Sequence, residues 1–460
     1  MSDGRDQSAK PPSPAEREFV RGLELQRRGE LDVARRAYAR ALAIDPRHRN
    51  ALNNLGVALR SQGRLEAAVV VYRRALALDP DNPGLHTNLG NALRALARPQ
   101  EALAHHQRAA ELSPKDAGAL HALGLTLRDL DRQVEAVRCF DGALQLAPGD
   151  ARATADLGRS LIAGGDLARG FGYYEARRAV DGAPPNPTEL PQWDGKPAKG
   201  RRLLLFDEGR DGDAILFARY IRRVAEAGAE VVVLCRPELA RLLATAPGVA
   251  RVIPRGRGRP EADLQAPLAS VPALLGLTRE DTAVDTPYLR VPKGAGPALE
   301  RPKGVRLTVG LAWAGEVAEA AVSPGLAACL PLAARADAAF YALQKGPPAA
   351  ELVETGAEGL VIDASGRIED LADMAGAIAR LDLTIAVGAP VAPLAAALGR
   401  PCWVVLPYAA DWRWCIAGTD SPWFPDVRVF RQPRPADWGG AVAAVGEALD
   451  VALAAAGSGD

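Results

Sequence analysis

The stretch ALNNLGVALRSQGRLEAAVVVYRRALALDP, residues 51–80, decides the fold of the first half of the chain, because a close copy follows it at a fixed distance. The copy is LHTNLGNALRALARPQEALAHHQRAAELSP, residues 85–114, which lies 34 residues further on. The same period runs from residue 15 to residue 184 without an insertion or a deletion. A fixed period of this length predicts stacked units of one design rather than a single globular core.

Several kinds of residue recur at the same place in each unit. A small residue lets the two helices of a unit approach closely, an aromatic or bulky residue is expected to fill the space between units, and a proline ends the second helix. Each unit is therefore expected to be a helix, a turn and a second helix. The recurring residues are Gly22, Gly56, Gly90, Gly124 and Gly158; Leu25, Leu59, Leu93, Leu127 and Leu161; Ala34, Ala68, Ala102 and Ala136; Tyr38, Tyr72, His106, Phe140 and Tyr174; and Pro46, Pro80, Pro114 and Pro148.

With these positions in place, residues 15–184 resemble tetratricopeptide repeats, as four full units and an atypical fifth at 151–184. Such units bury their apolar faces only by stacking, and the stack forms a superhelix with a long concave groove. The resemblance implies a protein or peptide partner in that groove.

An asparagine ladder clamps the bound polypeptide in the protein O-GlcNAc transferases, which the repeats resemble. Asn54 and Asn88 occupy the equivalent position here, whereas the next two units carry Ala122 and Asp156. The resemblance implies a short peptide clamp at these two asparagines. The alternative is that both are solvated residues of the inner helices.

The overall composition is that of a globular protein without strong charge. Hydrophobic residues make up 48% and charged residues 24%, and 56 basic residues balance 56 acidic ones, so no net field favours nucleic acid or an anionic membrane. Residues 1–14 lack the apolar core of a secretory signal, and no uncharged apolar stretch of about 18 residues predicts a membrane span.

The cysteines form no CxxC pair, which argues against zinc and disulfides and favours the cytoplasm; they are Cys139, Cys235, Cys329, Cys402 and Cys415.

The second half of the chain changes to short apolar runs that alternate with amphipathic stretches, a pattern typical of parallel sheets with crossover helices. The run RRLLLF at 201–206 is followed by a predicted helix at 214–228 and a predicted strand at 230–235. A second series contains strands at RLTVGLAWAG, FYALQKG, GLVID, LTIAV and CWVVLP and a helix at IEDLADMAGAIARL. We expect an all-α solenoid followed by an α/β region of two Rossmann-like halves. The expected parts are a tail at 1–14, repeats at 15–184, a proline-rich linker at 185–200, and α/β halves at 201–300 and 301–460.

An ordered set of strings makes this half similar to the heptosyltransferase-like glycosyltransferases of GT-B fold, particularly their bacterial members fused to tetratricopeptide repeats. The strings are GDAILFARYI, QAPLASVPALLG, PYL, GLAWAG, ALQKG, ALGRPCWVVLP, DWRW and SPWFPDVRVFRQ, and the resemblance covers 170–455. It implies transfer of a sugar from a nucleotide-sugar donor with inversion, without a metal and without a bound cofactor.

Inverting sugar transfer requires a base that takes the acceptor proton. The resemblance implies Asp213 as that base, with Glu208 as a substitute. The alternative for Asp213 is a helix cap. Imidazole chemistry is not expected in the α/β region, because all five histidines lie at or before residue 121; they are His48, His86, His105, His106 and His121.

The donor side departs from the family pattern. An aspartate, a threonine and a histidine that surround the diphosphate in the family are replaced here by Gly388, Ala389 and Pro393. Helix N-termini bind phosphate through free N–H groups, and proline has none. We expect this turn to have lost its anion site, with two prolines, Pro390 and Pro393, among the first residues of a helix that begins near 390.

Four polar residues remain for the donor: Ser323, Lys345, Asp411 and Arg413. Lys345 in ALQKG is expected to face a phosphate as a point charge, and an ordinary solvated lysine is the alternative. Trp412 and Trp414 beside them either stack on a base or pack between domains.

Three functions fit these observations. The chain is a transferase whose repeats present a protein acceptor, a catalytically dead relative that acts as an interaction scaffold, or a repeat protein with an α/β relic. Fold alone does not choose among them.

Overall fold

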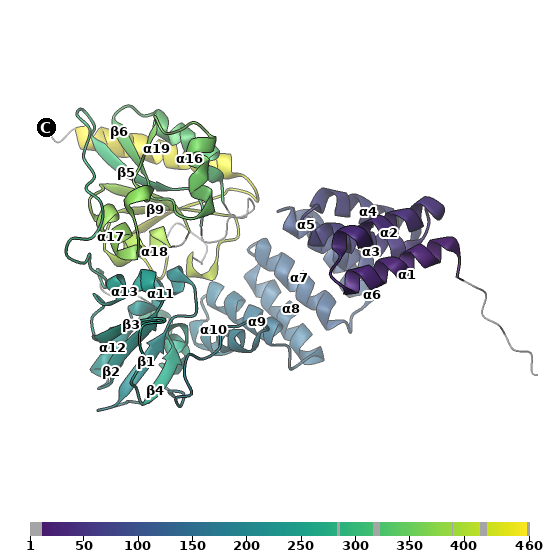
Figure 1. Cartoon of the computed structure of the whole chain (residues 1–460), viewed down its shortest axis with the longest axis horizontal. Helices are drawn as coiled ribbons and strands as arrows, with labels where there is room; N and C mark the ends of the chain where they lie inside the picture. The colour runs from purple at the N-terminus through teal and green to yellow at the C-terminus, as the bar shows by residue number, and fades with distance from the viewer. Residues whose placement is uncertain (1–11, 283–285, 316–322, 389, 415–420, 458–460) are drawn as a thin grey trace, which may run out of the picture. The chain divides into compact units, whose positions relative to one another are not determined.

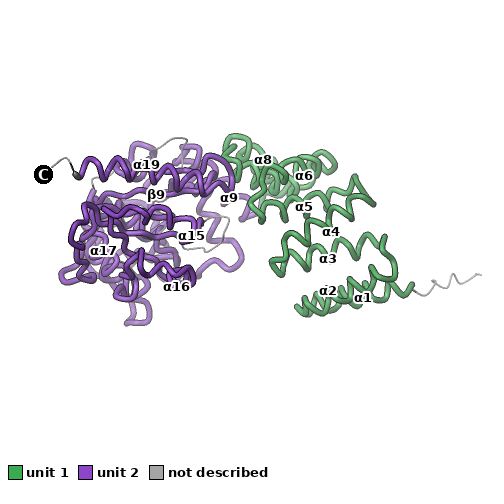
Figure 2. The backbone as a smooth tube through the Cα atoms, turned by 90° about the horizontal axis from the view of Figure 1, so that it is seen from above, with its two compact units in different colours: residues 1–148 green, residues 149–460 purple. Residues whose placement is uncertain are grey.

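The computed structural model describes residues 12–282, 286–315, 323–388, 390–414 and 421–457. The chain forms two compact units, Met1–Pro148 and Gly149–Asp460, coloured separately in Figure 2. The first is helical and the second begins with two helices and continues as an α/β region with parallel sheets (Figure 1). The repeat pattern thus predicted the helical region, and the alternating pattern predicted the parallel sheets.

Unit 1 consists, over its described residues, of four helical hairpins that match the four full repeats. The first helices of hairpins two to four are capped at their N-termini by the side chains of His48, Asn82 and Asp116, because the first N–H groups of a helix need an acceptor. The helices are α1 Pro14–Arg27, α2 Leu31–Ile44, α3 Arg49–Ser61, α4 Leu65–Leu78, α5 Pro83–Ala95, α6 Pro99–Leu112, α7 Ala117–Asp129 and α8 Gln133–Leu146.

The recurring glycine and the recurring ring of each hairpin form one contact. A Cβ on Gly56 would lie 2.4 Å from Cε1 of Tyr72, and one on Gly90 would lie 2.4 Å from Nε2 of His106. Only hydrogen fits there, so each ring packs on the glycine of its own unit. The His106 ring also contacts the next hairpin, where its Nδ1 lies 2.6 Å from Oγ1 of Thr126, as expected of a residue that fills the space between units.

Unit 2 starts with α9, Ala151–Ala163, and α10, Leu167–Tyr174, followed by the 3₁₀ turn η1, Glu175–Ala179. These two helices approach more closely than those of the full repeats. A Cβ on Gly158 would lie 2.5 Å from the backbone nitrogen of Tyr174, because no ring separates the helices here. The compact units divide before this pair, so the helices expected as a fifth repeat pack with the α/β region.

The proline-rich segment 185–200 is ordered along the first sheet. Gln192 pairs with Gln265 of strand β4, Leu264–Pro267, in a parallel bridge. The Gln265 amide group also donates to the backbone oxygens of Thr188 and Leu190 at 2.8 and 2.7 Å. Trp193 is buried. The segment therefore covers a sheet edge, which otherwise exposes unpaired backbone groups.

The first sheet has four parallel strands in the order β3-β2-β1-β4. The predicted strands at 202–206 and 230–235 are confirmed as β1 and β2, whereas the single helix predicted at 214–228 is wrong. It is divided into α11 and α12 at Arg219, whose buried guanidinium donates to backbone oxygens of Thr282 and Trp423 at 3.0 and 2.8 Å. The remaining bounds are β1 Arg202–Phe206, α11 Asp211–Ala218, α12 Ile221–Glu226, β2 Glu230–Cys235, α13 Pro237–Leu243, β3 Val249–Pro254 and α14 Val271–Leu274.

The second sheet has six parallel strands in the order β10-β9-β8-β5-β6-β7. All five strands predicted for this part and the helix predicted at 368–381 are confirmed, the helix with shorter bounds. The elements are β5 Leu307–Ala312, α15 Gly325–Cys329, β6 Ala338–Ala342, α16 Glu351–Glu354, β7 Val361–Asp363, α17 Leu371–Ala379, β8 Leu383–Val387, α18 Val391–Ala397, β9 Cys402–Leu406, β10 Val427–Arg431 and α19 Trp438–Gly457.

Within the part of the chain that the structure describes, α19 is the one helix whose length and composition would allow a membrane span. Val445 and Leu449 on this helix are fully buried in the core of the second sheet. Asp450 on its other face accepts a hydrogen bond from Arg335 at 2.6 Å. These contacts are those of an amphipathic core helix.

Candidate functional site

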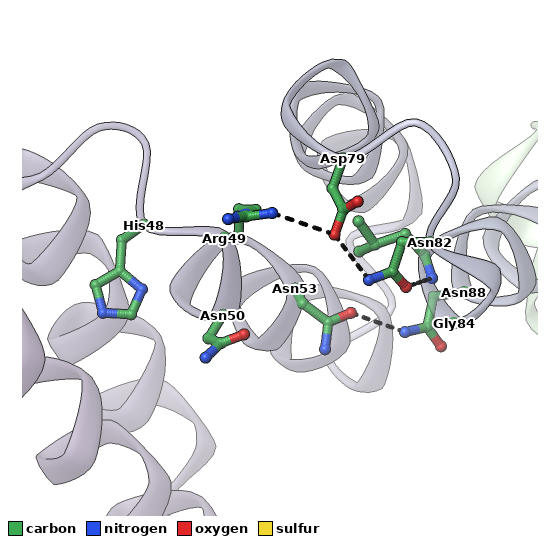
Figure 3. Close-up of a pocket in the computed structure, with 9 residues that line it drawn as sticks. His48, Arg49, Asn50, Asn53, Asp79, Asn82, Gly84 and Asn88 are labelled. Carbon is green, nitrogen blue, oxygen red and sulfur yellow. Dashed lines mark hydrogen bonds and ion pairs between the residues drawn. The ribbon is translucent and has the colours of Figure 1, made fainter.

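A polar pocket of about 440 Å³ opens on unit 1 between the second and third hairpins (Figure 3). Asparagine side chains from both hairpins line it, and the start of α5 forms one wall. The lining residues are His48, Arg49, Asn50, Asn53, Asp79, Asn82, Gly84, Leu85 and Asn88. The pocket therefore offers mainly neutral amide groups, with one cation and one carboxylate at its rim.

Asn53 on α3 and Asn88 on α5 point toward each other in Figure 3 and are hydrogen-bonded. Nδ2 of Asn88 donates to Oδ1 of Asn53 at 2.9 Å. Asn54, the residue expected to clamp a peptide, instead donates to the backbone oxygen of Asn50 in its own helix at 3.0 Å, and it is absent from the pocket lining. Only Asn88 of the two predicted asparagines lies in the pocket, and Asn53 is the partner that sequence reasoning missed.

The rim of this pocket is held in place by a small polar network. Nδ2 of Asn82 donates to Asp79 at 3.1 Å, and Oδ1 of Asn82 accepts the N–H of Leu85 at 3.1 Å, which caps α5. Arg49 lies 3.6 Å from the same carboxylate of Asp79. The charges at the rim thus neutralise each other, which leaves the amides of Asn53 and Asn88 as the polar centre.

In unit 2, Asp213 is the third residue of α11, and its carboxylate is paired with Arg413. Nε of Arg413 donates to Oδ1 of Asp213 at 2.5 Å, while Nη1 of Arg413 lies 2.5 Å from Asp411. Arg210, not Asp213, precedes the helix, so the capping alternative is wrong. Burial lowers the pKa of Arg413, but Asp213 and Asp411 outweigh this and raise that pKa well above its ordinary value. The structure thus brings three predicted site residues together as an ion cluster.

Glu208, the predicted substitute base, is also paired with an arginine. Its Oε2 lies 2.7 Å from Nη2 of Arg177, which belongs to η1 and also donates to Ser270 Oγ at 2.8 Å. Burial raises the pKa of Glu208, and the charge of Arg177 acts against that rise. Both carboxylates proposed as bases are therefore neutralised by buried guanidinium groups.

Trp412 lies in an aromatic cluster that joins α10, α11 and the segment before β10. Its ring is stacked on Phe217 with centroids 6.1 Å apart and meets Phe171 edge-on at 6.1 Å. Trp414 packs on Phe424 with centroids 5.4 Å apart. Both tryptophans are buried, so they have packing roles, as the alternative for them predicted.

The turn expected to hold a diphosphate leads directly into α18. Gly388 has a φ of +64°, a left-handed conformation that suits glycine, and Ala389 lies outside the described residues. The helix begins at Val391 with Pro390 before it, so Pro393 is the single proline among its first four residues, where we expected two. All seven residues of α18 are buried. Helix α18 packs against α11, and α17 packs against α13 (Figure 1).

The other two predicted donor residues also have partners within the chain. Nζ of Lys345 donates to the backbone oxygens of Ser365 and Ile368 at 3.1 and 2.7 Å. Ser323 is buried, and its Oγ accepts the N–H of Gly315 at 3.3 Å. The polar loop before Ser323, residues 316–322, lies outside the described residues. Lys345 is exposed, as the solvated alternative expects, while its ammonium group is also held by these two backbone oxygens.

Arg177, Arg219 and Ser270 were not identified from the sequence. Their roles depend on partners far along the chain, such as Ser270 for Arg177 and Trp423 for Arg219. Asn53 had a visible signal, because it follows Asn50 by three residues and so shares one face of α3. Among the described residues, no group of three or more His, Cys, Asp or Glu side chains is arranged to hold a metal ion.

Family models identify the repeats directly. One described as "TPR repeat" matches residues 56–96, and one described as "Tetratricopeptide repeat" matches residues 85–118. The N-terminal region therefore contains tetratricopeptide repeats, a class that takes part in protein–protein interaction. No curated protein sequence matches the chain.

Solved repeat proteins resemble the same region. The MamA protein is 23% identical over 38% of this chain and 98% of its own, with a TM-score of 0.33. YrrB, described as a TPR protein with an unusual peptide-binding site, is 24% identical over 36% of this chain and 86% of its own, with a TM-score of 0.32. PilF of Pseudomonas aeruginosa is 24% identical over 37% of this chain and 78% of its own, with a TM-score of 0.34. These structural similarities are too weak to add to what the family models show.

Proposed function

We propose that this chain recruits a protein partner through the repeats and that its α/β region is a glycosyltransferase-like body of GT-B type without catalytic activity. The observation that carries the proposal is the pairing of Asp213 with Arg413. Two nitrogens of the Arg413 guanidinium contact Oδ1 of Asp213, so an acceptor hydroxyl would have to compete with a buried ion pair for this carboxylate.

The pocket between the second and third hairpins matches the chemistry of an extended peptide. After Asn88 donates to Asn53, the pair still offers the N–H groups of the Asn53 amide and the oxygen of the Asn88 amide. A peptide unit presents one C=O and one N–H, which these groups complement. Because the charges at the rim neutralise each other, the pocket favours a main chain over a strongly charged side chain.

The GT-B assignment rests on the two parallel sheets and on the ordered family strings. Each sheet presents the carboxyl ends of its strands at one edge, where α/β proteins bind ligands. Asp213 and Glu208 follow β1, and Gly388 follows β8, so the expected base and the expected donor turn both stand at such edges.

Packing between helices of the two α/β halves opposes a catalytic cycle in this proposal. The helices that carry the expected base and the expected donor turn, α11 and α18, touch each other. A Cβ on Gly376 of α17 would lie 2.2 Å from the backbone oxygen of Ala295, in the segment that connects the two sheets. Arg241 of α13 lies 3.1 Å from Asp370, which caps α17. These contacts hold the halves as a closed body.

The free thiols fit a protein of the cytoplasm. The cysteines in the described residues are unpaired, and burial raises the pKa of both Cys329 and Cys402 to about 12. Such thiols stay protonated and unreactive.

An active transferase is the second candidate, and the burial that raises the pKa of Glu208 favours it, because perturbed carboxyl groups gather at catalytic sites. It requires the binding of a nucleotide-sugar, which calorimetric titration of the full-length protein with such donors measures.

The recruiting function is tested with a displayed library of unstructured peptides, selected against the full-length protein. Selected peptides are then titrated against the double variant Asn53→Ala, Asn88→Ala and against Asn54→Ala, whose side chain bonds only within its helix. We expect the double variant to bind at least about tenfold more weakly, because two hydrogen bonds are lost, and Asn54→Ala to bind as the parent does. Equal binding by the parent and the double variant contradicts the assignment of the pocket.

A further inference from the structure

Two histidines of the third hairpin face each other at chelating distance. His86 lies on α5 and His105 on α6, and their Nδ1 atoms are 3.1 Å apart. The ring centroids are 5.3 Å apart with the planes 34° from each other. Both side chains are half-buried, which fixes the rings while leaving access for a small ion.

A backbone carbonyl decides which nitrogen of His86 carries its proton. Nε2 of His86 lies 2.9 Å from the oxygen of Pro80. A carbonyl only accepts, so the neutral ring must be protonated on Nε2, and its Nδ1 lone pair points at His105. In the metal-free pair, His105 therefore donates its Nδ1 proton to His86.

We propose that His86 and His105 together bind a transition-metal ion of the Cu²⁺, Ni²⁺ or Zn²⁺ class through their Nδ1 atoms. Metal–imidazole bonds of about 2.0–2.1 Å place two ligand nitrogens about 2.9 Å apart at a right angle and about 3.4 Å apart at a tetrahedral angle. The separation of 3.1 Å lies between these values. The carbonyl of Pro80 then serves as the outer hydrogen-bond acceptor that metal-bound histidines normally have.

Binding needs no change in the total number of protons on the pair. The proton on Nδ1 of His105 leaves to solvent, Nε2 of the same ring takes one up, and the freed Nδ1 lone pair binds the metal. Water molecules leave the ion in exchange and fill its remaining positions in the complex. Burial, followed by the charges of His86 and Arg73, lowers the pKa of His105, while Glu101 acts in the opposite direction.

The neighbouring charges select against hard cations. Glu101, one turn before His105 on α6, is engaged by Arg98 at 2.5 Å and by Arg73 at 3.2 Å. Ca²⁺ and Mg²⁺ require oxygen ligands, and the carboxylate nearest the pair is already held by two arginines. Imidazole nitrogens suit copper, nickel and zinc, and copper is expected to bind most tightly.

The test uses untagged full-length protein, stripped with a chelator and titrated by calorimetry with Cu²⁺, Ni²⁺, Zn²⁺ and Mg²⁺. The variants are His86→Gln and His105→Gln, with His121→Gln of the next hairpin as the matched control and circular dichroism as the check on folding. We expect Cu²⁺ binding that is weakened at least about tenfold in each of the two variants and is unchanged in the control. Electron paramagnetic resonance of the Cu²⁺ complex should show two coupled imidazole nitrogens.

Three results would overturn the proposal. One is Cu²⁺ binding of the same strength in the parent and in both variants, which would place the ion elsewhere. Another is a resonance spectrum of the parent with fewer than two imidazole nitrogens. Preferential binding of Mg²⁺ would also contradict a site built from nitrogen ligands.

Discussion

Asp213 and Arg413 are 200 positions apart in the sequence, and their side chains share a hydrogen bond of 2.5 Å in a buried ion pair. Only 9% of the Arg413 side chain and 12% of the Asp213 side chain are exposed. Asp213 contributes a residue of α11, whereas Arg413 follows β9 of the second sheet. The pair therefore connects the two halves of the α/β region. It also engages, in an ion pair, the carboxylate that a transferase would need as its base.

Removing the charge of Asp213 should destabilise unit 2. In Asp213→Asn, Arg413 keeps Asp411 but loses its most buried partner, and we expect the free energy of unfolding in urea to fall by about 3 kcal/mol. The matched control is Asp194→Asn, because Asp194 is paired with Lys196 at 2.8 Å but both side chains are exposed. That variant should change the free energy of unfolding by less than about 0.5 kcal/mol. If the two variants lose the same stability, Asp213 is not a structural partner.

Adding a methyl group to Gly56 should destabilise the repeats. The new Cβ would lie 2.4 Å from the ring of Tyr72, so the two helices of the second hairpin must move apart, at a cost of about 1–3 kcal/mol. Gly172→Ala on α10 is the control, because its Cβ would meet no atom within 4 Å. It should stabilise the protein by up to about 1 kcal/mol through helix propensity. Thermal unfolding followed by circular dichroism measures both variants, and an unchanged midpoint for Gly56→Ala would refute the close approach.

The buried ring of His106 should make the repeats sensitive to acid. Its Nδ1 lies 2.6 Å from Thr126 Oγ1, and burial first, with the charge of Arg94, lowers its pKa to about 4. Between about pH 6.5 and about pH 4, His106 is protonated in the unfolded chain but neutral in the folded chain. Stability is therefore complete above about pH 6.5 and falls as the pH drops through this window, by roughly 2–3 kcal/mol.

His106→Phe isolates that effect, because Phe140 occupies the equivalent position of the next hairpin. Thr126 keeps its hydrogen bond to the oxygen of Ala122 at 3.0 Å in this variant. Urea unfolding at pH 7.5 and at pH 4.5 should show a smaller loss of stability for His106→Phe than for the parent. Equal losses would mean that other groups cause the acid sensitivity.

The repeats could be predicted from the sequence because their contacts are local and recur. Gly56 and Tyr72 are only 16 positions apart, and the same pair recurs every 34 residues, so period alone reveals the hairpins. Seven strands were equally visible, since buried parallel strands are continuous apolar runs such as LTIAV at 383–387, whereas the strands β3, β4 and β10 were not predicted.

The site was less predictable, because its contacts join residues that no local pattern relates. Asp213 and Arg413 were both identified as site residues, but as a base and a donor ligand rather than as each other's partner. The break at Arg219 was missed because an arginine fits a helical pattern, while its main-chain acceptors at Thr282 and Trp423 lie 63 and 204 positions away. Asn53 and Asn54 are neighbours on α3, but successive helical residues face different directions. Only Asn53 therefore lines the pocket.

The most direct test of the proposed function is a calorimetric titration of the full-length protein with UDP-, GDP-, CMP- and dTDP-sugars, repeated with Lys345→Ala. The proposal predicts no saturable binding by either protein, because α11 and α18 pack together and the donor turn carries Gly388, Ala389 and Pro393 in place of the polar residues of the family. Saturable binding of any of these donors at micromolar concentration, weakened in Lys345→Ala, would contradict it and establish a working donor site.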